Sequence, residues 1–426
     1  MVLLLAFLAI YVWRSHPRLD GELRLAGLSS PVTVQRDGAD VTHVLARTPR
    51  DAWQALGYVH AQERGWQLEF NRRVMRGQLS EVFGAATLET DKLLRALGIM
   101  RAAQAQWEGL PPDVRAALQV YSDGVNAFHA SSTQALAPEF HVLGVEPGRW
   151  EPQDSVGWSL MMALDLGGNW GNEFARLSAA RVVGTPQLWQ LFPPYPGEAP
   201  ASGVDFSKLY ADLGIYRAAA GTKTSVLSPL EPARQSLAAA APHAMQAWAD
   251  AFVRDAGTLE GKGSNNWAVA GGLSKSGKPL VANDPHLGLS APAIWYFARL
   301  QAPGLDVVGA TLPGLPFVII GRTQRVAWGF TNTAPDVQDL YIEQINPSDA
   351  RQYRTPDGWA EFKTRVERIK VKNGADVNLT VRETRHGPVL SDAQSAHGDV
   401  LDLKSHVLAL RWSALDADNL TLVAGL

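Results

Sequence analysis

The stretch GKGSNNWAVAGG, residues 261–272, places a serine between a glycine and two asparagines, directly before an apolar, strand-like run. Ser264 lacks the G-x-S-x-G surroundings of an α/β-hydrolase nucleophile and the lysine of an S-x-x-K serine. A serine in this position ordinarily opens a β-hairpin. The alternative is that the chain is cut immediately before Ser264, which would turn this residue into an N-terminal nucleophile.

An N-terminal serine would carry its own base. A free α-amine titrates at about 7.7–8.0, so it accepts a proton near neutral pH and the hydroxyl needs no separate histidine. Gly263 has no side chain, and we expect it to let the bond before Ser264 adopt the strained geometry that an N→O acyl shift requires.

Composition excludes several other classes of protein. The 426 residues have a net charge of −3 and no cysteine. A near-neutral chain without Lys/Arg blocks argues against nucleic-acid binding, and the lack of cysteine excludes a thiol nucleophile, a zinc ribbon and a disulfide framework. Residues 272–279, GLSKSGKP, spell G-x-x-x-x-G-K, but a proline follows where a phosphate-binding loop needs Ser or Thr and a helix. This segment predicts a turn.

Ser264 also marks a change of pattern along the chain. Residues 19–199 are mainly helical, with a hairpin pattern at 29–45 and a helix start at Thr48, where Pro49 takes the first helical position and Asp51 closes a capping box. Another helical region, 153–184, is interrupted by two glycines, Gly167 and Gly168.

Two segments of different character follow. Residues 200–263 are rich in Pro, Ala, Gly and Ser without a sustained period, which predicts a linker or exposed spacer. Residues 264–426 are short strand-like runs separated by turn residues, with a hairpin turn at 372–374. The sequence therefore predicts an α+β protein, mainly helical in its first half and β-rich in its second.

Residues 1–18 form an apolar run followed by basic residues. Val2 to Trp13 is too short to span a bilayer but matches the hydrophobic region of a secretory signal, although no basic residue precedes it and no small-x-small cleavage site follows. We expect an export signal that starts upstream or an uncleaved N-terminal anchor, and hence a periplasmic or periplasm-facing protein. A buried helix is the alternative.

Several stretches, which follow one another in the same order as in the family, resemble the penicillin acylase family of N-terminal-nucleophile amidohydrolases. This family includes penicillin, cephalosporin and acyl-homoserine-lactone acylases. The stretches are DAWQALGYVHAQERGWQLEFNRRVMRGQLSEVFG (51–84), GSNNW (263–267), ANDPHLG (282–288) and VAWGFTNTAPDVQDLYIE (326–343). The resemblance implies an αββα sandwich and α and β chains cut from one precursor. It also implies hydrolysis of a small N-acyl amide, such as a β-lactam antibiotic or an N-acyl homoserine lactone, through an acyl-enzyme.

The resemblance assigns catalytic roles to particular residues. Ser264 becomes the nucleophile, freed by cleavage after Gly263. His286 matches a histidine that lies near the new amine, and Asn332 matches the position whose backbone N–H forms half of the oxyanion hole. For His286 alone, a satisfied turn or core residue is the alternative.

The family also binds calcium where the two chains meet, and it uses no organic cofactor. The matching ligands are Glu173, Asp336, the Gln338 carbonyl and Asp339. Oxygen ligands of this kind suit a hard cation. Without the resemblance, Asp336 and Asp339 would be ordinary loop acids.

An apolar acyl pocket is expected beside Ser264. Its predicted lining is Leu287, Phe317 and Phe330, with Met162 and Leu166 from the helical half. Flexible leucine and methionine side chains favour aliphatic acyl chains over a phenylacetyl group.

The chain also departs from the family, whose members continue well beyond the nucleophile segment. Because it ends at Leu426, we expect a C-terminally truncated sequence in which a second oxyanion-hole asparagine and a nearby arginine are missing. A secreted binding or scaffold module, or a degenerate, non-catalytic family member, are the alternatives to an active amidohydrolase.

Overall fold

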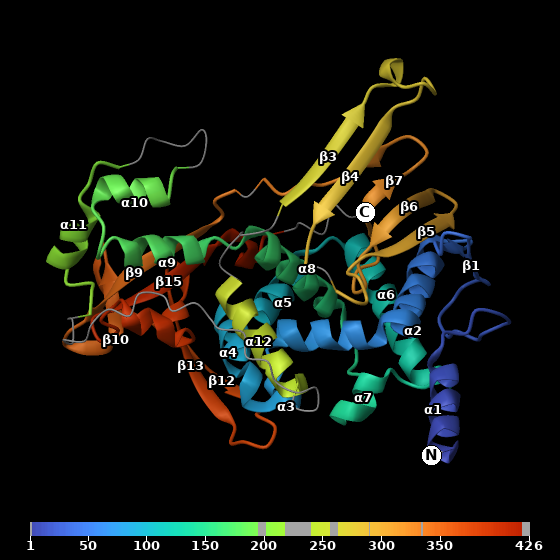
Figure 1. Cartoon of the computed structure of the whole chain (residues 1–426), viewed down its shortest axis with the longest axis horizontal. Helices are drawn as coiled ribbons and strands as arrows, with labels where there is room; N and C mark the ends of the chain where they lie inside the picture. Colours follow the sequence, from blue (N-terminus) through green and yellow to red (C-terminus); the bar gives the residue numbers. More distant parts are fainter. Residues whose placement is uncertain are drawn as a thin grey trace.

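A computed structural model describes residues 2–194, 202–217, 240–255, 263–288, 290–333 and 335–419 (Figure 1). The helices are α1 (Val2–Ser15), α2 (Pro49–Arg76), α3 (Ser80–Phe83), α4 (Leu88–Leu97), α5 (Ile99–Gly109), α6 (Pro112–Ser131), α7 (Pro138–Leu143), α8 (Pro152–Gly167), α9 (Trp170–Ala179), α10 (Thr185–Leu191), α11 (Phe206–Asp212) and α12 (Ala240–Asp255). The strands are β1 (Thr33–Arg36), β2 (Thr42–Leu45), β3 (Gly263–Val269), β4 (Leu280–His286), β5 (Tyr296–Ala302), β6 (Leu305–Thr311), β7 (Val318–Arg322), β8 (Ala327–Trp328), β9 (Gln338–Asn346), β10 (Asp349–Thr355), β11 (Gly358–Glu361), β12 (Lys363–Ile369), β13 (Val377–Thr384), β14 (Gly387–Pro388) and β15 (His406–Trp412). The expected α+β class, helical first and β-rich second, is confirmed.

Helix α2 begins as its sequence predicts, with one difference in the cap. Thr48 is extended and its hydroxyl accepts from the Asp51 N–H, while Pro49 occupies the first turn. The buried Asp51 carboxylate does not close a capping box: it accepts from the N–H and the hydroxyl of Ser29, at 2.8 and 2.6 Å, and from the Thr48 hydroxyl. The expected local pair is thus replaced by a tertiary contact that ties the incoming chain to α2.

Helices α2 and α6 cross closely at two glycines. A Cβ on Gly57 would lie 2.2 Å from the Tyr121 carbonyl oxygen, and one on Gly124 would lie 2.0 Å from the Gln54 carbonyl oxygen. Only glycine permits this approach of the two backbones. The crossing brings buried side chains of both helices, His60 of α2 among them, towards the neighbouring sheet.

A six-stranded sheet joins the two halves of the chain. Its order is β1-β2-β5-β6-β7-β8, antiparallel except where β2 pairs in parallel with β5. The β1–β2 hairpin expected from residues 29–45 therefore forms, and it extends a sheet whose other strands come from the second half. Strand residues of this sheet and apolar residues of α2, α5, α6 and α8 share one continuous core.

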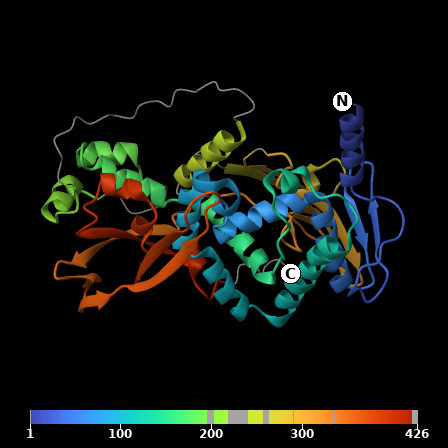
Figure 2. The same cartoon turned by 90° about the horizontal axis from the view of Figure 1, so that it is seen from below.

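Strands β9 to β15 form two further sheets on the other side of the helices (Figures 1 and 2). One has the order β11-β10-β9-β15 and the other β12-β13-β14. The hairpin predicted at 372–374 connects β12 to β13, and Asn373 adopts a positive φ of 59° there. Helix α9 packs against β9, which places the end of the helical part beside the start of this β region.

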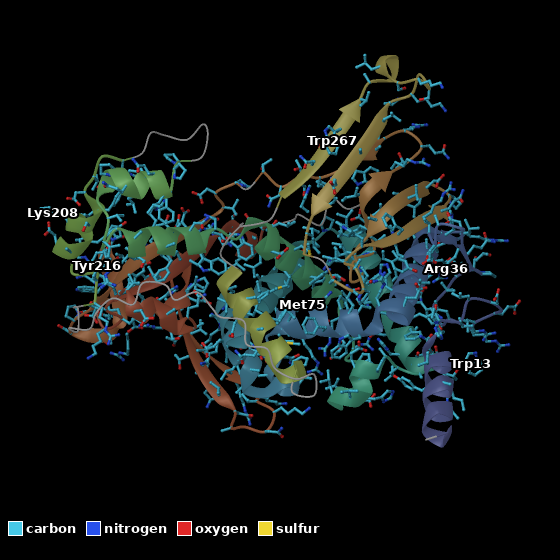
Figure 3. The ribbon with its side chains drawn as sticks, viewed as in Figure 1. Trp13, Arg36, Met75, Lys208, Tyr216 and Trp267 are labelled. Carbon is cyan, nitrogen blue, oxygen red and sulfur yellow. The ribbon has the colours of Figure 1, made fainter. Side chains whose placement is uncertain are left out.

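The β3–β4 hairpin stands apart from these sheets. Its two strands pair with each other over residues 263–269 and 280–286, in register Ser264↔Pro285. It projects from the body of the molecule, with Trp267 along β3 (Figure 3), and Trp267 is 55% exposed.

Part of the predicted spacer is folded. Residues 202–217 contain α11, and residues 240–255 form α12, which packs on α4. Ala249 of α12 is buried, Trp248 contacts Phe70 at 5.3 Å between ring centroids, and Trp248 stacks on Phe252. An exposed, unpacked spacer is therefore the wrong description of residues 240–255; residues 218–239 lie outside the described part of the chain.

Helix α1 lies against the segment between α6 and α7. The Tyr11 hydroxyl donates to the Leu136 carbonyl at 2.6 Å, and the Ala135 N–H donates to the Arg14 carbonyl. Among the described residues, no helix combines the length and the apolar character needed to cross a bilayer.

Candidate active site

Ser264 lies at the start of β3 with its hydroxyl beside the preceding peptide bond. The Oγ donates to the Gly263 carbonyl oxygen at 2.6 Å. The Ser264 carbonyl in turn accepts from the Thr331 hydroxyl at 2.7 Å. Among the described residues, no atom lies within 4 Å of the place that a Cβ on Gly263 would take. The strained geometry expected for an N→O acyl shift at this bond stays a prediction.

An asparagine that the sequence analysis passed over fixes the segment opposite Ser264. Asn283 of β4 accepts from the Phe330 N–H at 2.7 Å and donates to the carbonyls of Phe330 and Asn265 at 2.9 and 3.0 Å. Gly329 makes this approach possible, because a Cβ there would lie 2.6 Å from Asn283 Oδ1. In the sequence, the one feature that pointed to Asn283 was its place in the ANDPHLG stretch.

Asn332 links the same segment to the helical half. Its Nδ2 donates to the Leu166 carbonyl, near the end of α8, at 2.5 Å. The backbone of residues 330–332 is thereby held between the β3–β4 hairpin on one side and α8 on the other. Ser264, Thr331 and Asn332 all face one cavity.

This cavity has a volume of about 910 Å³. All five residues expected to form an acyl pocket line it: Leu287, Phe317, Phe330, Met162 and Leu166. Three tryptophans that the sequence analysis did not assign also line it, Trp53 of α2, Trp295 and Trp328. They come from three distant parts of the chain, so no local pattern marks them as neighbours.

His286 lies on the other side of its strand. Pro285 and Leu287 line the cavity, and alternation along β4 points the half-exposed His286 side chain away from it. Its Nε2 is 3.9 Å from an Asp284 carboxylate oxygen, and within the described residues it makes no hydrogen bond to Ser264. In the hairpin register, however, His286 is the partner of Gly263.

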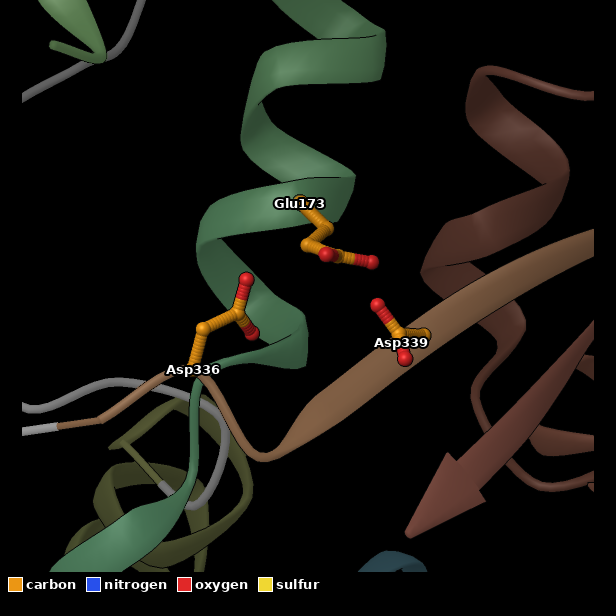
Figure 4. Close-up of side chains that lie close together, drawn as sticks. All are labelled: Glu173, Asp336 and Asp339. Atoms are coloured by element: carbon orange, nitrogen blue, oxygen red, sulfur yellow. The ribbon is translucent and has the colours of Figure 1, made fainter. Parts of the chain in front are cut away.

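Three carboxylates converge where α9 meets the start of β9 (Figure 4). One oxygen each from Glu173, Asp336 and Asp339 lie within 4.8 Å of one another. Glu173 comes from the helical half and the two aspartates from the β half. Glu173 Oε2 also accepts a hydrogen bond from the Leu340 N–H at 2.6 Å.

Asn169 and Gln338 build the frame under these carboxylates. Asn169 Nδ2 donates to Asp336 Oδ1 at 2.5 Å and to the Gln338 carbonyl at 2.9 Å, and the Asn169 N–H donates to Gln338 Oε1 at 2.7 Å. The Gln338 carbonyl, expected as a metal ligand, is thus already hydrogen-bonded. Asn169 was missed because it follows the Gly167–Gly168 break and carries no charge.

Burial raises the pKa of Glu173 to about 7, opposed by the Leu340 N–H and Arg176 and assisted by the two aspartates. Arg176 lies 3.6 Å from Glu173, and its side chain is partly exposed. A group of oxygen ligands that repel one another when ionised is suited to hold a metal ion, and hard divalent cations take such ligands. The donor set therefore fits a metal ion.

Comparison with known proteins gives a consistent result. The penicillin amidase family model matches residues 31–426. The chain is 35% identical to penicillin acylase 2 proenzyme from Pseudomonas sp. (strain SE83), over 91% of this chain and 47% of that protein. It is 32% identical to acyl-homoserine lactone acylase QuiP from Pseudomonas aeruginosa, over 95% of this chain and 46% of that protein. It is 27% identical to penicillin G acylase from Escherichia coli, over 86% and 46%. The chain thus spans about half the length of these relatives.

Proposed function

Because the chain belongs to the penicillin amidase family, we propose that it is the precursor part of an N-acyl amide hydrolase whose nucleophile is Ser264. The observation that carries the proposal is the opening of Ser264 onto a large apolar cavity lined from both halves of the chain. A hairpin serine with only a structural role needs no such cavity.

We propose that cleavage between Gly263 and Ser264 creates the active form, with α and β chains derived from one precursor. The Ser264 hydroxyl already lies beside the carbonyl of the bond to be cut. Oγ would attack that carbonyl carbon, the C–N bond would break as the nitrogen takes up a proton, and water would then hydrolyse the ester. The products are a carboxylate on Gly263 and a free amine on Ser264.

In the mature form this amine is the base. It takes the proton of Oγ as Oγ attacks the substrate amide carbon, and it delivers that proton to the departing nitrogen. Water then hydrolyses the acyl ester and restores the hydroxyl. We assign His286 to the surroundings of the new amine, since the departure of Gly263 empties the place opposite His286 in the hairpin.

We assign the Asn332 backbone N–H as one oxyanion donor. Support comes from its place on the cavity wall with Ser264, and from the anchoring of its side chain on Leu166, which limits movement of the backbone. Loss of one such donor typically lowers kcat about 10²–10³-fold.

We propose that Glu173, Asp336 and Asp339 hold a calcium ion, with the Gln338 carbonyl nearby. The charge and oxygen chemistry of the group fit this ion. Bound there, the ion would neutralise the carboxylates and tie the helical half to the β half, which is a structural role.

We propose aliphatic N-acyl amides as substrates, and a periplasmic or periplasm-facing location. The volume of the cavity is near the upper end of the range of about 300–1,000 Å³ common for ligand sites. A phenylacetyl group would fill only part of this volume. Each buried CH₂ contributes about 0.8 kcal/mol, so kcat/KM should rise with acyl length.

Ser264→Ala, made in the protein expressed from its complete reading frame, tests the proposal. The unchanged protein should give two chains with a new N-terminus at Ser264, and the variant a single inactive chain. Ser274→Ala is the matched control, because Ser274 is a turn serine of the same hairpin that bonds the Lys278 carbonyl. Cleavage of the Ser264→Ala chain at the same bond would show an external protease, and an uncut wild-type chain would favour a binding module.

A further inference from the structure

A short loop forms part of the wall of the cavity, and its middle residue is bound on both sides. Residues 312–317 supply Leu312, Leu315, Pro316 and Phe317 to the lining. Gly314, at the centre of the loop, has a φ of +115°, and an added Cβ would lie 3.0 Å from the Trp158 ring. Substituting any other residue for Gly314 would therefore strain the backbone.

Two buried hydroxyls hold this glycine. The Gly314 N–H donates to the Tyr121 hydroxyl at 2.7 Å, and the Gly314 carbonyl accepts from the Ser155 hydroxyl at 2.6 Å. Tyr121 and Ser155 are fully buried. They belong to α6 and α8, so the loop is fastened to the helical half through one residue.

The Tyr121 hydroxyl is itself oriented by a chain of hydrogen bonds whose direction can be deduced. The Thr311 hydroxyl gives its hydrogen to the Tyr296 carbonyl at 2.7 Å, so it accepts from His60 Nε2 at 3.1 Å. Burial lowers the pKa of His60 to about 3, and a neutral ring has one N–H. His60 Nδ1 therefore accepts from Tyr121 at 2.8 Å, which leaves the Tyr121 oxygen free to accept from Gly314.

We propose that Tyr121 and Ser155 are positioning residues that fix the 312–317 wall and thereby set the acyl-chain length that the cavity accepts. The inference rests on the proposed function for the chemistry of the ligand. Neither residue lines the cavity. Both act by holding Gly314, so that Leu315, Pro316 and Phe317 keep one position.

The test is Tyr121→Phe, which keeps the ring and removes the oxygen. Tyr353→Phe is the matched control: Tyr353 is also buried, and its hydroxyl accepts from a backbone N–H, that of Arg385 at 2.8 Å, in a different sheet. Both variants should lose thermal stability. Only Tyr121→Phe should lower the ratio of kcat/KM between the preferred acyl chain and one four carbons shorter, by about tenfold, which is about 1.4 kcal/mol.

Binding separates this inference from the proposed function. In a Ser264→Ala background, hexanoate, decanoate and phenylacetate are titrated calorimetrically into the protein with and without Tyr121→Phe, and Ser155→Ala should act in the same direction. If the acids bind with a length preference that Tyr121→Phe removes, while the protein that retains Ser264 hydrolyses no N-acyl amide, the inference stands and the proposed function fails. If Tyr121→Phe lowers stability but leaves both length profiles within twofold, the inference is wrong.

Discussion

Removing the charge of Glu173 should stabilise the metal-free protein and destabilise the calcium-loaded one. The carboxylate oxygens of Glu173, Asp336 and Asp339 lie within 4.8 Å, where two like charges repel by about 1 kcal/mol in water and about 3 kcal/mol at an effective dielectric constant of 20. Both aspartates are exposed, so the lower figure applies. At pH 8, above the Glu173 pKa of about 7, Glu173→Gln should raise the free energy of unfolding of the metal-free protein by about 1 kcal/mol. The Gln oxygen can still accept from the Leu340 N–H.

Calcium reverses the sign of the effect. A ligand present at one hundred times its Kd stabilises the folded state by about 2.7 kcal/mol. Glu173→Gln removes one anionic ligand and should forfeit most of this, so the variant becomes less stable than the wild type by about 1–2 kcal/mol in calcium.

The assay is urea unfolding at pH 8, followed by tryptophan fluorescence, in EDTA and in excess calcium. Glu89→Gln is the matched control, because among the described residues the exposed Glu89 pairs with Lys92 alone and should give the same small change in both buffers. An effect of Glu173→Gln with the same sign and size in both buffers would refute a shared cation at this cluster.

Three further predictions concern pH, the hairpin contact and the helix crossing. Burial lowers the pKa of His60 to about 3 and that of His397 to about 4. As pH drops, these histidines take up protons in the unfolded state first, so the free energy of unfolding should fall between about pH 6.5 and pH 4. Calorimetry that shows no such fall would contradict this. Asn283→Ala should slow cleavage before Ser264 and lower the free energy of unfolding by about 1–2 kcal/mol, because three hydrogen bonds at an exposed site are lost. Gel analysis of processing checks this prediction, and cleavage at the wild-type rate would refute it. Gly57→Ala should overpack the helix crossing, lowering the free energy of unfolding by about 1–3 kcal/mol and Tm with it. Gly65→Ala on the same helix should not, because the nearest atom among the described residues, on His129, would lie 3.9 Å from its Cβ. Equal Tm changes would refute the close crossing.

Much of the fold could be predicted because its signals are local. Thr48 and Pro49 mark the start of α2 by their own backbone preferences. Lys372, Asn373 and Gly374 similarly form a turn whichever sheet the strands join. The candidate nucleophile and the carboxylates were predicted by the order of short stretches that resemble the family. These signals depend on spacing within a few residues, so sequence alone displays them.

Tertiary structure decided which of these elements meet. Asp51 pairs with Ser29 instead of capping its own helix, α12 packs where composition predicted a spacer, and His286 points away from the cavity that its neighbours line. Trp53, Trp295 and Trp328 line one cavity although they come from α2, the segment before β5, and β8. The sequence determined the chemical groups and the local elements. Their partners depend on which buried faces pack together, and that is set by the whole core rather than by any segment of it.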